Sequence, residues 1–344
     1  MSKLRLLLAL SALAAVAVAA SAAPALQTAW QINAGDTAWF ANDNNTRDLA
    51  YNAVTDHVLV VSRTGGLSVQ ILDAATGMAA SPSTMSVAGV AGGTFPLSHI
   101  DVADDGVIYG ANLTINAVTT AFTVYRWASE EATATVAYSA TGEISGRTGD
   151  AFAVTGAGAS TTIYATGSAN VSIEVFTTGD GVTFAHAGVI GRANDDHRLG
   201  IDVLPGGNLL ISDPGSQVQE IDGAGSVLNS VATSEIDNLA APLSVGSIGG
   251  LTLAVVQGGP VSSFGGTVLD ITGGVAAATA IGVIPASGNP NDPAAPNANG
   301  NGVGAAELDT TNQTVLFLNT NNSIGSYFSN AGGVPVELSV FSEN

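Results

Sequence analysis

The feature that most constrains this fold is a strand-and-turn unit that recurs about every 50 residues. Its clearest copy is residues 200–226, GIDVLPGGNLLISDPGSQVQEIDGAGS, in which the turn-forming clusters Pro-Gly-Gly and Asp-Pro-Gly-Ser separate three apolar runs. Three short strands are not stable alone in water, so each unit must pack against its neighbours. The other five copies begin at Leu49, His99, Ala151, Pro242 and Val303.

A fourth strand fits between successive copies, for example at Thr133–Ala140 and Phe184–Ile190. A four-stranded sheet that recurs with this period is typical of a propeller blade. Gly and Asn interrupt the chain too often for helical periodicity. The sequence therefore predicts an all-β fold, a six-bladed β-propeller of four-stranded antiparallel blades, over residues 23–333.

Two terminal segments compete to close the ring. Thr28–Asn33 can serve as the outer strand of the sixth blade, and Val334–Phe341 is the alternative. We favour closure by the N-terminal segment. Residues 334–344 are then a free C-terminal strand or the start of a further domain, and an unused strand offers an edge for self-association.

A Pro/Asn/Gly-rich run, Pro285–Gly302, separates the fifth and sixth copies. It is too long and too polar for a tight turn, so we expect a loop on one face of the ring. An inert insertion, a flap over a ligand and a cation-binding loop are the alternatives.

Residues 1–22 predict a secretory signal. Lys3 and Arg5 form a basic start, Leu4–Ala20 is apolar, and Ala20–Ala22 is a small-residue cleavage site. An uncleaved membrane anchor is the alternative, but the run is short and rich in Ala. We expect a bacterial protein that is secreted or held at the cell surface, with no membrane span after signal cleavage.

The composition excludes several kinds of site. The chain has no cysteine, so neither disulfides nor thiolate metal sites stabilise it. After residue 22 it carries six Arg, no Lys and 28 acidic residues, a net charge of −22, which argues against nucleic-acid binding.

Parts of the chain resemble known families. Residues 202–222 resemble the repeat of NHL-type six-bladed propellers. The segments NNTRDLAYNAVTDHVLVVSR, HIDVADDGVIYGANL and FTVYRW together resemble a family of secreted bacterial propellers that is known only as a domain of unknown function. This resemblance implies a fold but no activity.

The C-terminal residues 332–341, GGVPVELSVF, resemble the entry strand of type IX secretion cargo. In such cargo this strand opens a small domain that carries the sorting signal. The sequence ends at Asn344, before such a domain, so we expect either a fragment of a longer surface protein or a shortened gene.

Charged residues gather just ahead of, or at the start of, the inner strands, where propeller loops converge on the central channel. They are Arg47, Asp48, His99, Arg147, Asp150, His197 and Arg198. Such a ring could hold an anionic or sugar ligand through charge-assisted hydrogen bonds. Alternatively, these residues pair with one another and hold neighbouring blades together.

Two loops carry oxygen-bearing side chains that could bind Ca²⁺, which takes six to eight oxygen ligands. The residues are Asp36, Asp43, Asn45, Asn194, Asp195 and Asp196. Neither loop has the spacing of an EF-hand, and Asn and Asp are also ordinary turn residues.

Four aromatic residues, Trp39, Tyr51, Tyr125 and Trp127, could form a platform for stacking a sugar. The alternative, which we favour for Tyr125 and Trp127 at the end of a third strand, is that they fill space between blades.

The function these features favour is a non-catalytic, extracellular binding or scaffold protein. Its partner would be a glycan, a peptide, a surface polymer or a second copy of the chain. The alternative is a metal-dependent, lactonase-like hydrolase with Glu307 as a metal ligand, although we expect Glu307 to be a structural residue at a blade edge. The N-terminal Glu-Gly-Pro of such lactonases and a Gly-x-Ser-x-Gly nucleophile turn are both missing, and His57 and His186 are too far apart in the repeat order to share a metal.

Overall fold

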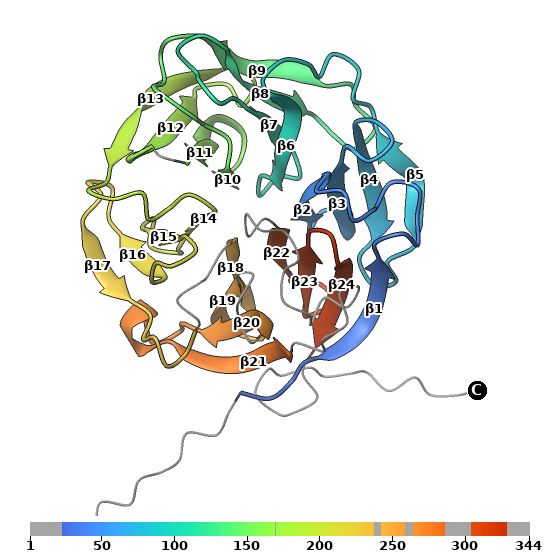
Figure 1. The fold of residues 1–344 in the computed structure, drawn as a ribbon, viewed down its shortest axis with the longest axis vertical. Coiled ribbons are helices and arrows are strands. Elements are labelled where there is room, and N and C mark those ends of the chain that lie inside the picture. Colours follow the sequence, from blue (N-terminus) through green and yellow to red (C-terminus); the bar gives the residue numbers. More distant parts are fainter. Residues whose placement is uncertain (1–22, 169, 237–241, 259–263, 286–303, 329–344) are drawn as a thin grey trace, which may run out of the picture.

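The computed structural model describes residues 23–168, 170–236, 242–258, 264–285 and 304–328. Over these ranges the chain forms six antiparallel four-stranded sheets arranged in a ring (Figure 1). This confirms the predicted six-bladed propeller. No helix in the described ranges has the length and apolar character needed to cross a membrane. The predicted signal, the Pro/Asn/Gly-rich run from residue 286 onward and the segment 334–344 lie outside the described residues.

Each blade contributes four strands, ordered from the channel outward. Blade 1 consists of β2 (Thr46–Asn52), β3 (His57–Ser62), β4 (Ser68–Asp73) and β5 (Ala79–Met85). Blade 2 consists of β6 (Phe95–Val102), β7 (Ile108–Leu113), β8 (Phe122–Trp127) and β9 (Thr135–Ala140). Blade 3 consists of β10 (Ala151–Thr155), β11 (Thr162–Thr166), β12 (Ser172–Thr178) and β13 (Phe184–Gly191). Blade 4 consists of β14 (Gly200–Val203), β15 (Leu209–Ser212), β16 (Gln219–Ile221) and β17 (Val227–Ser230). Blade 5 consists of β18 (Leu243–Ile248), β19 (Leu251–Gln257), β20 (Phe264–Asp270) and β21 (Thr279–Pro285). Blade 6 consists of β22 (Gly304–Asp309), β23 (Thr314–Asn319), β24 (Ser323–Phe328) and β1 (Gln27–Asn33).

The repeated turn between first and second strands explains why the copies are recognisable in the sequence. In blade 2 the Gly106 amide donates to the Ala103 carbonyl, and in blade 4 the Gly207 amide donates to the Leu204 carbonyl, each over 2.8 Å. Both glycines have φ above +80°, a conformation that other residues adopt only with strain. The Asp-Gly and Gly-Gly pairs are therefore required by the geometry of this turn.

The N-terminal segment closes the ring, as we favoured from the sequence. Strand β1 pairs antiparallel with β24 and forms the outer strand of blade 6. The preceding residues reach blade 5, because Leu26 and Val283 form a backbone hydrogen bond of 2.8 Å. In the other direction, the Trp30 indole donates to the Ala74 carbonyl of blade 1. One segment thus ties three blades together.

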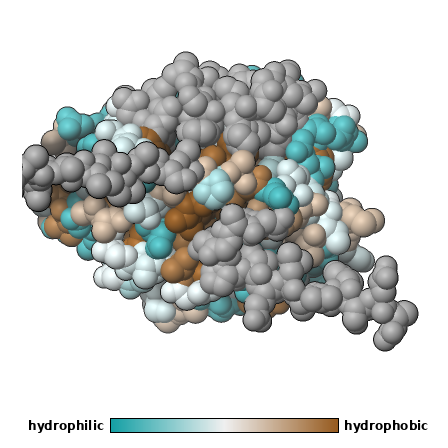
Figure 2. Space-filling model, turned by 90° about the horizontal axis from the view of Figure 1, so that it is seen from below, coloured by the Kyte–Doolittle hydropathy of each residue, from teal (hydrophilic) through white to brown (hydrophobic). Residues whose placement is uncertain are grey.

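The side of the ring near this closure is partly apolar. Figure 2 views the ring from below and shows apolar residues among polar ones on that side. A small apolar cavity between blades 5 and 6 is lined in part by Leu26, Leu253 and Tyr327. Leu26 also packs against Gly282, where a Cβ atom would lie only 2.7 Å from the leucine side chain. The N-terminal segment therefore contributes apolar packing as well as backbone pairing.

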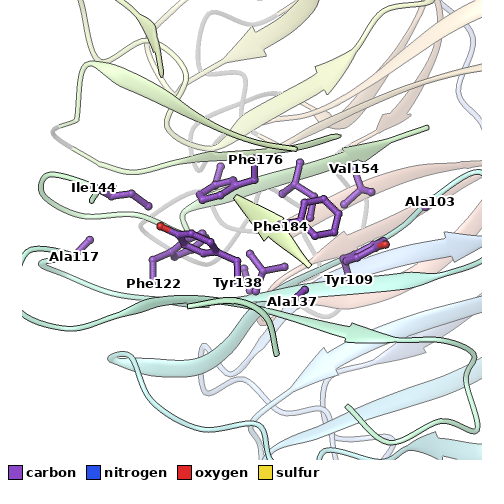
Figure 3. Packing of buried hydrophobic residues seen from close by; sticks show 14 residues of the cluster. Ala103, Tyr109, Ala117, Phe122, Ala137, Tyr138, Ile144, Val154, Phe176 and Phe184 are labelled. Carbon is purple, nitrogen blue, oxygen red and sulfur yellow. The ribbon is translucent and has the colours of Figure 1, made fainter. Parts of the chain in front are cut away.

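Six hydrophobic clusters form the core, one between each pair of neighbouring blades. Between blades 2 and 3, Phe176 packs against Phe122 and Tyr138 with ring centroids 5.6 and 4.7 Å apart (Figure 3). Burial of such faces on both sides of every sheet is the main source of stability in a fold without disulfides.

The four aromatic residues considered for a sugar platform belong to two of these clusters. Tyr125 and Trp127 are buried between blades 1 and 2, which confirms their predicted packing role. Trp39 and Tyr51 pack against the cluster between blades 6 and 1. The structure therefore does not bring the four rings together on one surface.

A fully buried polar residue lies at or next to the end of the second strand in every blade. The six are Ser62, Asn112, Thr166, Ser212, Gln257 and Asn319. Two of them bind the loops that precede β2 and β14: the Ser62 hydroxyl donates to the Trp39 carbonyl over 2.5 Å, and the Thr166 hydroxyl donates to the Arg198 carbonyl over 2.9 Å. Such bonds fix the loops that lead into the inner strands, where the candidate site lies.

Candidate functional site at the central channel

The central channel is lined by the inner strands of the six blades. We call the end at which these strands begin the mouth; its cavity is lined by Asp48, His99 and Gly304, among others. Further along the strands lies a wider cavity of about 280 Å³, which we call the chamber. Asp101, Asp202 and Glu307 are among the residues that line the chamber.

Asp48 and His99, both predicted ligand residues, connect blades 1 and 2 at the mouth. The Asp48 Oδ2 atom lies 3.0 Å from His99 Nδ1 and accepts a hydrogen bond from the Ile100 amide over 3.0 Å. Its Oδ1 atom accepts a hydrogen bond from the Leu49 amide. This pair supports the alternative in which the charged ring holds blades together.

Arg147 and Asp150 pair within the loop that leads into β10. The guanidinium meets the carboxylate in two hydrogen bonds, Nε to Oδ2 at 2.6 Å and Nη2 to Oδ1 at 2.5 Å. The Ser168 amide also donates to Oδ2 over 2.6 Å. The hydrogen bonding to Asp150 raises the pKa of Arg147. The planar two-point contact fixes the loop at the mouth.

The loop before β14 supplies the arginines of two further ion pairs, one within the loop and one to Asp213, which directly follows β15. Arg192 binds Asp196 with Nη2 to Oδ2 at 2.7 Å, and Arg198 binds Asp213 with Nε to Oδ1 at 2.8 Å. Burial raises the pKa of Asp213 to about 6, although the Arg198 charge opposes this shift. His197 is fully buried with Nδ1 3.3 Å from Asp196 Oδ1. The predicted residues of this loop therefore also have protein partners.

Two arginines at the mouth differ from the others. Arg47, a predicted ligand residue, and Arg63, which the sequence analysis did not single out, form no ion pair with a carboxylate of the described chain. Burial lowers the pKa of Arg47, and burial together with repulsion from Arg47 lowers the pKa of Arg63 to about 10. Both cations thus lie in surroundings that do not fully compensate their charge.

Three partly buried carboxylates from alternate blades line the chamber, Asp101 of blade 2, Asp202 of blade 4 and Glu307 of blade 6, and the exposed Asp104 also lines it. Asp202 accepts hydrogen bonds from its neighbour Val203 over 2.7 Å and, across the blade boundary, from Val245 over 2.5 Å.

Asp101 repeats this arrangement with the amides of Val102 and Val154. Each aspartate therefore connects its blade to the next.

The surroundings of these carboxylates disfavour their charged forms. Burial raises the pKa of Asp202 to about 6. Burial, followed by repulsion from Asp202, raises the pKa of Asp101 well above its usual range. Burial, followed by repulsion from Asp101 and Asp202, does the same for Glu307, whose Oε2 accepts a hydrogen bond from the Ser244 hydroxyl over 2.9 Å.

Glu307, which we expected to be a structural residue at a blade edge, lies on the inner strand β22, lines the channel and binds Ser244 of blade 5. Asp101 and Asp202 were not singled out at all. The repeated Ile-Asp-Val at residues 100–102 and 201–203 could have revealed them, because a carboxylate inside an apolar inner strand needs a partner.

The two loops predicted to bind Ca²⁺ satisfy part of their oxygens locally. Asp36 accepts hydrogen bonds from the backbone and side-chain amides of Asn33. Asp43 accepts hydrogen bonds from Asn45 and from the Thr64 hydroxyl. Asn194 and Asp195 share the second loop with Asp196, which binds Arg192. In the described ranges no three His, Cys, Asp or Glu side chains are grouped to hold a metal ion, so calcium binding stays a prediction.

The remaining two histidines lie in separate places. His57 Nδ1 is 2.7 Å from Glu130 Oε2, and His186 Nε2 is 2.8 Å from Glu174 Oε2. Both pairs lie outside the channel, so the structure does not bring the two histidines together.

Comparison with known proteins identifies fold relatives only. No protein-family model matches the chain, and no curated protein matches its sequence. Among solved structures, a DUF4623 family protein from Bacteroides eggerthii is similar with a TM-score of 0.63 and 16% identity, over 88% of this chain and 76% of that one.

A protein of unknown function from Bacteroides thetaiotaomicron has a TM-score of 0.55 and 12% identity, over 88% of this chain and 72% of that one. The WD40 propeller domain of Doa1 has a TM-score of 0.50 and 13% identity, over 83% and 79% of the two chains. At these identities the likeness shows a shared fold and nothing about activity.

Proposed function

We propose that this protein is a secreted, non-catalytic propeller that binds an extracellular glycan, peptide or surface polymer at the mouth of its channel. One observation carries the proposal: five of the six arginines after residue 22 lie in or beside the loops at the mouth. They are Arg47, Arg63, Arg147, Arg192 and Arg198. In a chain with a net charge of −20, this concentration of cations at one end of a channel favours recognition of an anionic group there.

The geometry gives less support to the lactonase-like alternative. Glu307 reaches the channel, but the oxygens of Asp101 and Asp202 accept backbone hydrogen bonds that connect the blades. These carboxylates are therefore better explained as structural groups than as a ligand set for a catalytic metal.

Retention on immobilised polymers tests the proposal. The full chain is run through gels that contain acidic polysaccharide, neutral glucan or peptidoglycan, beside a double variant, Arg147→Gln with Arg198→Gln. Glu131→Gln, an exposed acidic position outside the channel, serves as the control. We expect an acidic polymer to retard the wild type and the control more strongly than the double variant, because the double variant has lost two of the five arginines at the mouth. Equal retardation of all three would place the ligand away from Arg147 and Arg198, and no retardation by any polymer would contradict a binding function.

Localisation is tested separately. We expect fractionation of a bacterial culture that expresses the chain to recover it in the medium or at the cell surface. Recovery only from the cytoplasm would contradict secretion.

A further inference from the structure

We infer that Arg47 and Arg63 form a binding site for one small oxyanion, a carboxylate or a sulfate group, at the blade 1 side of the mouth. This inference rests on the proposed function, because it names the chemical group that the mouth recognises. It also adds a residue, Arg63, that lies in the turn after β3 and was not among the predicted ligand residues.

The pairing of β2 with β3 brings the two arginines to the same end of blade 1. Thr46 and Ser62 are antiparallel partners at this end, Arg47 follows Thr46 within β2, and Arg63 follows Ser62 at the start of the turn after β3, two positions away from Arg47 along the ladder. The Arg63 amide donates to the Asn45 carbonyl over 3.1 Å, which extends the pairing to the turn. The ladder shifts its register between Thr46 and Asp48, so Arg47 occupies a bulge. Bulges commonly redirect a side chain at a binding site.

Each arginine is held in position without being neutralised. The Arg63 guanidinium lies 4.0 Å above the Phe95 ring, and its Nη1 donates to the Ser98 hydroxyl over 3.3 Å. Arg47 donates from Nη1 to the Asn44 carbonyl over 3.4 Å, and its buried Nε has no hydrogen-bond partner. A buried donor without a partner is costly, and an anion at this point would satisfy it.

The nearby carboxylates are already engaged. Asp48 is bound by His99 and two backbone amides, and Asp150 is bound on both oxygens by Arg147. Asp43 accepts hydrogen bonds from Asn45 and Thr64. The charge of Asp43 offsets part of the repulsion on Arg63, and the charges of Asp150 and Asp48 act in the same way on Arg47, but none of these carboxylates forms an ion pair with either arginine in the described chain. Two adjacent guanidiniums with free donors match the paired oxygens of an oxyanion.

Calorimetric titration of the full chain with sodium sulfate and, separately, with sodium acetate tests the inference, at an ionic strength held constant with sodium chloride. We expect saturable binding by the wild type, weakened about tenfold or more in Arg63→Gln and in Arg47→Gln because a charge-assisted contact is lost. Arg126→Gln is the control, since Arg126 bonds the Gly181 carbonyl at the opposite end of blade 2. Two variants are used because either one could fail to fold, which circular dichroism would detect.

Each outcome has one meaning. Preference for sulfate or for acetate identifies the oxyanion. Wild-type affinity in both folded variants, or no saturable binding by the wild type, overturns the inference. Because polymer retention is measured separately, retention that survives without sulfate or acetate binding would contradict only the Arg47–Arg63 site, not the proposed function.

Discussion

At the mouth, most buried charges face side chains of opposite sign, whereas in the chamber three carboxylates face one another. The Arg147–Asp150 pair represents the first region, with two hydrogen bonds between the charged groups. Asp202 represents the second, where backbone amides of two blades bind a carboxylate that lies near two others. The inner strands and their loops thus place charges in two ways: carboxylates at the mouth have a cationic or histidine partner beside their backbone donors, whereas Asp202 in the chamber has backbone donors and no cationic partner.

This comparison predicts different responses to substitution. Loss of a chamber carboxylate leaves backbone donors unpaired, whereas loss of a partly exposed mouth arginine lets water take its place beside the carboxylate. A buried unsatisfied group costs more than a lost surface ion pair.

Asp202→Ala is expected to have the largest effect. It removes the acceptor for the Val203 and Val245 amides, and we expect the free energy of unfolding to fall by ~2–3 kcal/mol. Asp202→Asn retains one acceptor oxygen and should lose about half as much. Urea unfolding measures both. An unchanged stability of Asp202→Ala would mean that channel water replaces the carboxylate.

The pH dependence of stability is expected to be the next largest effect. Because the chamber raises the carboxylate pKa values above their unfolded values, the folded state binds protons more tightly. The folded state gains the full stabilisation from this tighter proton binding only when the pH lies below the pKa of the carboxylic acid in the unfolded chain, about 4. It is lost as the pH rises through about 6, the pKa of Asp202.

We therefore expect the free energy of unfolding to fall by roughly 1–2 kcal/mol between pH 4.5 and 7.5. Glu307→Gln should flatten this decline, because it removes one repelling charge while Ser244 keeps an acceptor. Glu131→Gln removes an exposed charge outside the channel and should retain the wild-type slope. Equal slopes in the two variants would contradict repulsion within the chamber.

A double-mutant cycle on Arg147 and Asp150 is expected to give a smaller effect. Replacement by Gln and Asn, singly and together, should show a coupling energy of ~1–1.5 kcal/mol, because the contact is bidentate and the Asp150 side chain is almost fully buried. Thermal or urea unfolding of the four proteins measures it. Additive effects would show that the pair does not stabilise the mouth.

Arg198→Ala is expected to have the smallest effect. The Arg198 side chain is 31% exposed and contacts Asp213 through one atom pair. Its loss should reduce the free energy of unfolding by less than ~1 kcal/mol, and the reduction should shrink further in high salt. A loss as large as that of Asp202→Ala would remove the distinction between mouth and chamber.

The sequence predicted the fold well because local signals repeat. The inner strands that begin at Ala151 and Gly200 start where the repeat copies do, and the predicted fourth strands at 133–140 and 184–190 correspond to β9 and β13. Turn glycines such as Gly106 and Gly207 mark positions where the backbone itself restricts the residue type. Closure by the N-terminal segment was also predicted, since that segment precedes the first blade.

The candidate site was predicted less completely. The charged loops before the inner strands were found, and Arg147 and Asp150 pair as adjacent opposite charges suggest. Arg63 was not found, because it lies in a turn between the second and third strands, and only the pairing of β2 with β3 brings it to the same end of blade 1 as Arg47.

The sequence alone determined the all-β class, the number of blades and the turns, because these depend on short-range alternation and on glycine conformations that recur in each copy. Only the tertiary structure decided which charges meet. Asp101, Asp202 and Glu307 come from alternate blades, about 100 residues apart along the chain from one to the next, and ring closure brings them to one chamber. Their raised pKa values, and the lowered pKa values of Arg47 and Arg63, depend on burial and distance, which arise only when the blades are assembled.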